Sequence, residues 1–163
     1  MKANNAPSKS GKESYKLICS NKKAAFEYEL GERLEAGLVL AGTEVKSLRL
    51  GKANLSDSYA KLSGGELHLI GAHISAYPSA FYGNHDPLRK RKLLLHSKEI
   101  KKLTGKITEK GRSLIPLKLY FKNGLAKVEI ALARGKKLHD KRRSLKEQDT
   151  KREIQRTVRE YNR

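Results

Sequence analysis

Basic side chains crowd residues 134–143, which read RGKKLHDKRR, and such side chains are the ones that contact phosphate groups. The one acid in this segment, Asp140, comes directly before Lys141 and Arg142, which favours a local cap or an intramolecular tether over charge balance. A charge run of this kind is equally compatible with a solvated face or a disordered tail. The choice between these interpretations depends on the rest of the chain.

The chain has five histidines, at positions 68, 73, 85, 96 and 139, which make an enzyme or a metal site an alternative interpretation. None of them forms a metal-binding pair at helical spacing, and the sequence has no H-E-x-x-H, G-x-S-x-G, Walker or G-x-G-x-x-G motif. His85 and Asp86 precede Pro87, and Asp-Pro is a turn signal. An RNA hydrolase that uses His85 and Asp86 is therefore the weaker alternative. We predict no catalytic residue, no metal site and no cofactor.

The charge of the chain predicts a polyanionic partner. Its 163 residues, enough for one domain with tails, include 36 Lys or Arg against 17 Asp or Glu, a net charge of +19. Residues 134–163 carry +7 of this charge, which leaves +12 on the preceding residues. Aromatic residues are few and Trp is absent, so stacking on an aromatic platform is not expected to dominate. Phosphate contact and shape recognition of a structured RNA fit this composition better.

The sequence predicts a cytoplasmic protein that has no membrane partner. No apolar run approaches the roughly 20 residues of a spanning helix, and residues 1–16 lack the apolar centre of a signal peptide. Cys19 is the only cysteine, which excludes an internal disulfide and fits a reducing compartment.

Three regions follow from composition. Residues 1–14 are polar and predict a flexible N-terminal arm. Residues 15–133 predict an RNA-binding β-barrel body. Residues 134–163 predict a basic tail that is disordered when free and helical when bound, because it has strong helix formers but few apolar residues.

Within the body, two hairpins are expected at Asn123-Gly124, inside the alternating segment 114–133, and at Gly64-Gly65. Ser97 begins a predicted amphipathic helix that ends near Gly105 or Gly111. A strand is expected at residues 26–30. Apolar residues at helical spacing in 34–48 predict a short helical turn followed by a strand.

The sequence thus predicts about six short strands with one inserted helix. This order of elements indicates a mainly β fold, a small antiparallel barrel of the oligonucleotide-binding (OB) type. A sandwich or another α+β arrangement could be built from the same elements.

Four motifs occur together and in order: EAGLVLAGTEVKSLR at 35–49, GKANLSDSYA at 51–60, HDPLRKRKLLL at 85–95 and ARGKKLHDKR at 133–142. They closely resemble the SsrA-binding protein (SmpB) family, and the match covers residues 21–142. The resemblance implies an OB-type barrel that binds the tRNA-like domain of transfer-messenger RNA. It further implies an adaptor for trans-translation, whose tail enters the empty mRNA channel of a stalled ribosome near the small-subunit decoding centre. We expect the protein to be a monomer.

The resemblance also assigns residues. Asn21, Glu35 and Leu94 stand where the family has residues tied to transfer-messenger RNA binding. A carboxylate such as Glu35 accepts hydrogen bonds from base amino groups or a 2′-hydroxyl, whereas Leu94 could equally belong to the core. Phosphate contacts are implied for Lys22, Lys23, Arg89, Arg91 and Lys92. The decoding-centre tail is matched by Arg134, Gly135, Lys136, Lys137, His139, Asp140, Lys141 and Arg142. A permanent ribosomal protein is the alternative that shares this charge and tail.

Overall fold

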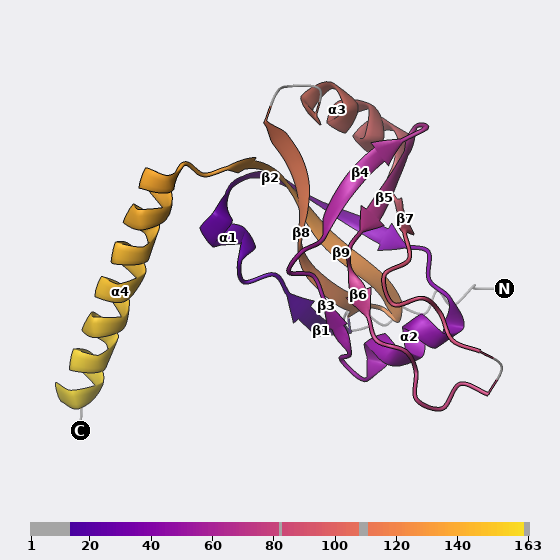
Figure 1. Ribbon diagram of the computed structural model, residues 1–163, viewed down its shortest axis with the longest axis horizontal. Coiled ribbons are helices and arrows are strands. Elements are labelled where there is room, and N and C mark those ends of the chain that lie inside the picture. Colours follow the sequence, from indigo (N-terminus) through magenta and orange to yellow (C-terminus); the bar gives the residue numbers. More distant parts are fainter. Residues whose placement is uncertain (1–13, 82, 108–110, 162–163) are drawn as a thin grey trace, which may run out of the picture.

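The computed structural model describes residues 14–81, 83–107 and 111–161, so most of the predicted arm lies outside the described residues. Strands form most of the body, and one long helix ends the described chain (Figure 1). In chain order the elements are β1 (Tyr15–Ser20), α1 (Ala24–Glu27), β2 (Tyr28–Leu38), α2 (Gly42–Arg49), β3 (Ala53–Asn54), β4 (Tyr59–Ser63), β5 (Glu66–Ile70), β6 (His73–Ile74), β7 (Arg91–Leu94), α3 (Ser97–Ile107), β8 (Arg112–Lys122), β9 (Leu125–Gly135) and α4 (Leu138–Tyr161).

Six strands of the described chain form a closed ring. Their hydrogen-bonded order is β8-β4-β5-β7-β2-β9, and β9 pairs with β8 again to close the barrel. Each of these pairings is antiparallel, and β1 extends the sheet beside β8. Strands β3 and β6 pair separately. The predicted mainly β fold with an OB-type barrel is confirmed.

Both predicted hairpins are confirmed. In the β8–β9 hairpin, Asn123 and Gly124 have φ values of 50° and 79°, as a type I′ turn requires. This two-residue turn fixes the register, so that Lys122 pairs with Leu125 and each earlier residue of β8 pairs with the corresponding later residue of β9 as far as Lys118. Gly64 and Gly65 likewise adopt positive φ between β4 and β5.

Alternate side chains of the strands fill the barrel. Leu67 and Leu69 of β5 and Val128 of β9 are examples, each at most 1 % exposed. Helices α2 and α3 lie at opposite ends of the barrel (Figure 1), where Leu48 and Leu103 join the core. The predicted helix at Ser97 is thus confirmed as α3, whose apolar stripe faces the strands.

Helix α1 covers part of the outer surface. Ala24 packs there with four residues of β8 and β9, in a second buried cluster that Tyr28 and Leu30 border. The helix is one turn long, so this packing and not helix propensity holds it in place. Both faces of β8 and β9 are therefore buried near α1.

The prediction for residues 34–50 was wrong in its order. A strand comes first, β2, and a helix follows, α2. The side chains of Leu34, Ala36 and Leu38 alternate into the barrel, as in a strand. The segment matched a helical period only when Leu34 and Leu38 were counted together with the apolar residues of α2. The strand predicted at 26–30 begins only at Tyr28, because Phe26 and Glu27 belong to α1.

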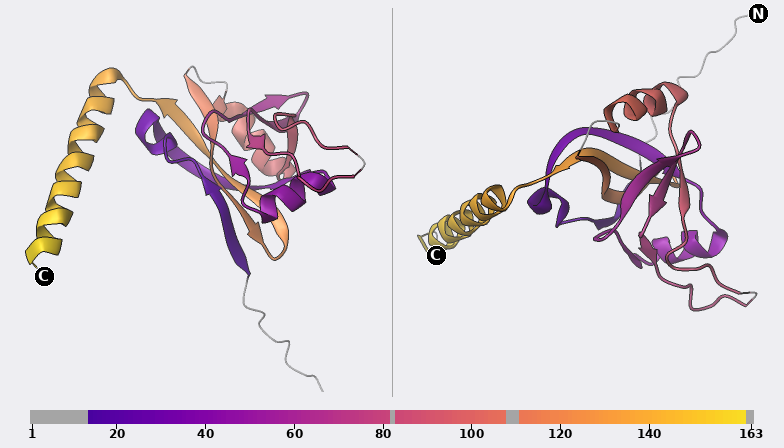
Figure 2. Two further views of the ribbon diagram at one scale, coloured as in Figure 1. Left: turned by 60° about the horizontal axis from the view of Figure 1, so that its bottom comes forward. Right: turned by 45° about the horizontal axis from the view of Figure 1, so that its top comes forward.

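Helix α4 extends away from the barrel in every view (Figures 1 and 2). The chain reaches it from β9, which runs to Gly135, two residues beyond the predicted end of the body. The tail is helical over Leu138–Tyr161 in this structure, and its disorder in the free state stays a prediction.

Candidate nucleic-acid interface

Five strands contribute one residue each to a row across the outer surface of the barrel. Residues that pair directly on antiparallel strands point to the same face of a sheet. The successive pairs are Leu17 with Tyr120, Tyr120 with Lys127, Lys127 with Gly37, and Gly37 with Leu94. We call these five residues the cross-strand row.

Leu94 lies at one end of this row and is exposed. Its exposed fraction is 51 %, and that of Leu17 at the other end is 49 %. Leu94 packs beside Gly37, where an added Cβ would lie 3.4 Å from the Cβ of Leu94. The structure therefore places Leu94 on the surface and not in the core, and its role in RNA binding stays a prediction.

Glu35 lies beside the row, two positions before Gly37 on β2. Its Oε2 accepts a hydrogen bond from the hydroxyl of Tyr120, and its Oε1 lies 3.5 Å from Nζ of Lys127. The hydrogen bond from Tyr120 lowers the pKa of the Glu35 carboxyl; partial burial opposes this effect, and Lys122 and Lys127 add to it. Glu35 is therefore an ionised, half-exposed acceptor at neutral pH.

Sequence reasoning missed four of the five residues of the cross-strand row: Leu17, Gly37, Tyr120 and Lys127. The Asn-Gly turn contained a signal for two of them, because its register makes Tyr120 and Lys127 direct partners. The pairing of Gly37 with Leu94 joins segments that are far apart in the chain. Local periodicity contains no information about such a pair.

The basic cluster at 89–92 is divided by the strand period. Lys90 and Lys92 are exposed, whereas Arg91 is 0 % exposed. Lys92 forms an ion pair with Glu66 on the outer surface of β5 and β7. The phosphate contact predicted for Arg91 is therefore corrected, since its guanidinium is buried among protein groups.

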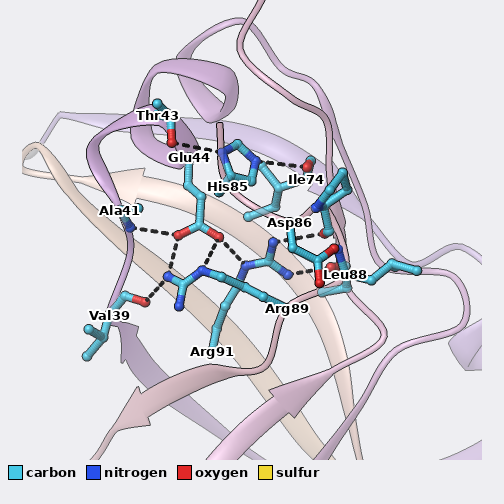
Figure 3. A network of polar contacts seen from close by, with 12 residues as sticks. Val39, Ala41, Thr43, Glu44, Ile74, His85, Asp86, Leu88, Arg89 and Arg91 are labelled. Carbon is cyan, nitrogen blue, oxygen red and sulfur yellow. Dashed lines mark hydrogen bonds and ion pairs between the residues drawn. The ribbon is translucent and has the colours of Figure 1, made fainter. Parts of the chain in front are cut away.

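A buried carboxylate binds Arg91 and Arg89 together (Figure 3). Glu44 Oε1 accepts hydrogen bonds from Nε of Arg89 at 2.9 Å and from Nε of Arg91 at 2.7 Å. Glu44 Oε2 accepts a second bond from Arg89 and one from the backbone N–H of Ala41 at 2.7 Å, at the start of α2. Arg91 also donates to the carbonyls of Ala72 and Pro87. The Glu44–Arg89–Arg91 network thus joins α2, β7 and the loop between β6 and β7.

Burial opposes ionisation of Glu44, but the bonds from Arg89, Ala41 and Arg91 outweigh it and lower the pKa of the carboxyl. Arg89 keeps a partly exposed side chain, at 35 %. A phosphate contact by Arg89 stays a prediction. If Arg89 makes this contact, Glu44 holds its guanidinium in place.

His85 and Asp86 make structural contacts in the same loop (Figure 3). The imidazole bridges Thr43 Oγ1, 2.9 Å from Nδ1, and the carbonyl of Ile74, 3.0 Å from Nε2. Asp86 Oδ1 accepts a hydrogen bond from the N–H of Leu88 at 2.9 Å, which is the predicted turn. Both ring nitrogens of His85 are occupied, an arrangement that suits loop anchoring better than acid–base catalysis.

Asn21 lies away from the row and is 8 % exposed. Its amide donates to the carbonyls of Leu55 and Pro116, and its Oδ1 accepts from the N–H of Ala24. These bonds fix the start of α1. The neighbouring Lys22 and Lys23 are exposed, so Asn21 positions the two lysines predicted to contact phosphate.

The tail leaves β9 along α1. The N–H of Lys136 donates to the carbonyl of Glu27 at 3.0 Å, and its Nζ donates to the carbonyl of Ala25 at 2.9 Å. The other predicted tail residues whose burial the structure describes are all exposed: Arg134, Gly135, Lys137, His139 and Asp140. Lys141 and Arg142 continue α4, and their side chains lie outside the described part of the chain.

No group of three or more potential metal ligands occurs in the part of the chain that the structure describes. Within the same ranges, no helix is both long and apolar enough to cross a membrane.

A basic OB-type barrel with an exposed polar and apolar row and a basic tail defines a nucleic-acid-binding protein. Comparison with known proteins narrows this class. The family model described as SmpB protein matches residues 18–160, and the chain belongs to this family.

Relatives cover most of the chain. The SsrA-binding protein of Syntrophobacter fumaroxidans is 60 % identical over 144 residues, which are 88 % of this chain and 89 % of that protein. The SsrA-binding protein of Geobacter metallireducens is 60 % identical over 89 % of this chain and 95 % of its own length. A solved chain, described as tmRNA-SmpB on a journey to the center of the bacterial ribosome, has a TM-score of 0.63 and 50 % identity, and covers 74 % of this chain and 85 % of its own length.

Proposed function

We propose that this protein is an RNA-binding adaptor for trans-translation. It binds the tRNA-like domain of transfer-messenger RNA and delivers this RNA to stalled ribosomes. One observation carries the proposal: in a chain that belongs to this family, Glu35 and Leu94 are distant in sequence but lie on the same surface. Leu94 pairs with Gly37 of β2 and packs beside it, and Glu35 lies two positions before Gly37 on the same strand. Glu35 accepts hydrogen bonds there, Leu94 adds apolar contact, and exposed lysines contact phosphates.

The tail has a separate task in this proposal. Its basic residues enter the empty mRNA channel, and the segment from Arg134 to Arg142 contacts the decoding centre of the small subunit. The bonds of Lys136 to α1 support this division, because they fix where the tail leaves the body. The protein acts as a binding protein without catalysis and works in the cytoplasm with the ribosome.

A gel shift with the isolated tRNA-like domain tests the proposal directly. Specific binding to this RNA, in preference to a duplex of equal length, is the expected result. A ribosome pull-down separates the adaptor from a permanent ribosomal protein. Recovery mainly on stalled particles supports the adaptor, whereas near-equal stoichiometry with all ribosomes contradicts it.

Binding is expected to weaken steeply with salt. Each phosphate that the protein neutralises contributes about −0.7 to −0.9 to the slope of log K against log salt. The double substitution Lys22→Gln with Lys23→Gln should make this slope less negative by up to about 2. Filter binding between low and moderate salt measures both values. An affinity for the tRNA-like domain that does not change with salt would contradict the prediction.

Glu35→Ala is expected to weaken binding to the tRNA-like domain about tenfold, because it removes a charged hydrogen-bond acceptor. Glu66→Ala is the matched control: it adds the same charge to the body from an exposed acid outside the row. Pure electrostatics predicts that both substitutions tighten binding. Gel shifts with this RNA and with a plain duplex distinguish the two accounts. Equal tightening by Glu35→Ala on both RNAs would show that Glu35 is only a surface acid.

A further inference from the structure

We propose that Tyr15 stacks on an unpaired nucleobase of the bound RNA, while Tyr120 beneath it positions the Glu35 carboxylate that binds the same nucleotide. This inference rests on the proposed function and identifies what the surface beside the cross-strand row recognises. It adds an aromatic contact to the RNA-binding surface, for which the composition of the chain predicted mainly phosphate contacts.

The two tyrosines form a tilted aromatic pair in which Tyr15 is the ring more open to solvent. Their ring centroids lie 4.9 Å apart with an angle of 38° between the planes. Tyr120 is 6 % exposed, whereas Tyr15 is 56 % exposed. A side chain that is supported on one side and open on the other offers a ring that is already ordered when the base arrives.

Tyr120 connects the aromatic pair to the carboxylate. Its hydroxyl donates to Glu35 Oε2, and Glu35 Oε1 lies 3.5 Å from Nζ of Lys127. Burial and the adjacent Glu35 raise the pKa of Tyr120, so the phenol remains the donor at neutral pH. Tyr120 is therefore a positioning residue, since it acts on RNA through Glu35.

The charges around the pair suit a nucleotide better than a protein partner. Tyr15 pairs across β1 and β8 with Lys122, and Leu17 extends the apolar surface beside them. Cations exceed acids among the charged residues of this face, which are Arg33, Lys118, Lys122 and Lys127 against Glu35 and Glu129. One nucleotide could make all three contacts: its base would stack on Tyr15, its 2′-hydroxyl or an amino group of the base would donate to Glu35, and its phosphate would lie near the lysines.

An unpaired base is required because a base inside a duplex is already stacked on both faces. Folded RNA presents such bases in loops and bulges, where aromatic side chains recognise them. Removing the ring, and with it one stacking contact, is expected to weaken the affinity about 5- to 150-fold.

Fluorescence tests the stack directly, because the sequence contains no Trp. Tyr15→Trp introduces a single indole, whose emission should be quenched by the tRNA-like domain and not by a blunt duplex of equal length. Phe81→Trp is the control, since Phe81 is a 93 % exposed aromatic on the loop between β6 and β7. Quenching confined to Tyr15→Trp supports the proposal. Equal quenching of both variants, or of neither, overturns it.

Affinity measurements on the full chain complete the test. Tyr15→Ala should lose about 5- to 150-fold on the tRNA-like domain, whereas Tyr15→Phe should bind like wild type. Tyr120→Phe should reduce the preference for this RNA over the duplex, and adding it to Glu35→Ala should cause no further loss. Additive losses would overturn the positioning role. If wild type binds the tRNA-like domain but Tyr15→Ala binds equally well, the stack fails and the proposed function stands. Absence of wild-type binding overturns both.

Discussion

Replacing Glu44 with Ala is expected to lower the free energy of unfolding by about 3–5 kcal/mol, because it leaves the buried charge of Arg91 without a carboxylate to neutralise it. Arg91 is 0 % exposed, and the same carboxylate holds Arg89 and the first turn of α2 (Figure 3). Urea unfolding followed by far-UV circular dichroism gives the value, provided that the slope with urea stays constant.

Two substitutions serve as controls. Glu44→Gln keeps the size of the side chain and an acceptor for Ala41 but removes the charge, so it should still destabilise the protein, by less than Glu44→Ala. Glu66→Gln breaks an ion pair whose side chains are both more than 40 % exposed, and it should change the urea midpoint little. A wild-type midpoint for Glu44→Ala would show that the network does not stabilise the fold.

The Glu44–Arg89–Arg91 network also predicts a sensitivity to acid. The folded protein lowers the pKa of Glu44 below its ordinary value of 4.5. A group with a lowered folded pKa contributes its full stability above the unfolded value and loses it as the pH falls through the folded value. The stability difference between wild type and Glu44→Gln should therefore be constant at neutral pH and shrink below about pH 4.5.

Local signals in the sequence predicted the parts of the fold that depend on neighbouring residues. Asn123-Gly124 fixed a hairpin because its backbone conformation and register are set within four residues. Ser97 and the apolar stripe after it likewise predicted α3. The segment at 34–50 failed because a strand and a helix follow one another there without a strong break, and their apolar residues share a helical spacing.

The candidate surface was less predictable, because its residues are joined across strands. The run Arg91–Leu94 illustrates both the signal and its limit. Its strand period places Arg91 and Leu93 inside and Lys92 and Leu94 outside, although the sequence R-K-L-L does not itself alternate between polar and apolar residues. The partners of these side chains, Glu44 for Arg91 and Gly37 for Leu94, come from other elements. Tertiary pairing determines such contacts, and composition does not.

Deleting residues 138–163 is expected to abolish peptide tagging on stalled ribosomes while leaving a folded body that binds the tRNA-like domain. The deletion removes α4, which extends away from the barrel (Figure 2), and keeps β9 and the bonds of Lys136 to α1. Among the side chains that the structure describes, each buried member of the core lies before Arg134, so the deletion removes none of them. Circular dichroism, a gel shift and a tagging assay on the same protein measure the three properties.

A milder change locates the effect within the tail. Asp140→Ala with Lys141→Ala and Arg142→Ala strikes the proposed decoding-centre segment and should also abolish tagging. The matched control removes the same three residue types farther along α4, as Asp149→Ala with Lys151→Ala and Arg152→Ala. Both variants change the net charge equally, so a purely electrostatic tail predicts equal losses.

The comparison separates contact at the decoding centre from general attraction to ribosomal RNA. Attraction of a basic helix to phosphates depends on its charge and weakens gradually as charges are removed. A specific contact depends on where the residues lie, so we expect tagging to fail in the first triple variant and to persist in the second. Binding of the tRNA-like domain should be unchanged in both. Normal tagging by the protein that lacks residues 138–163 would contradict the role proposed for the tail.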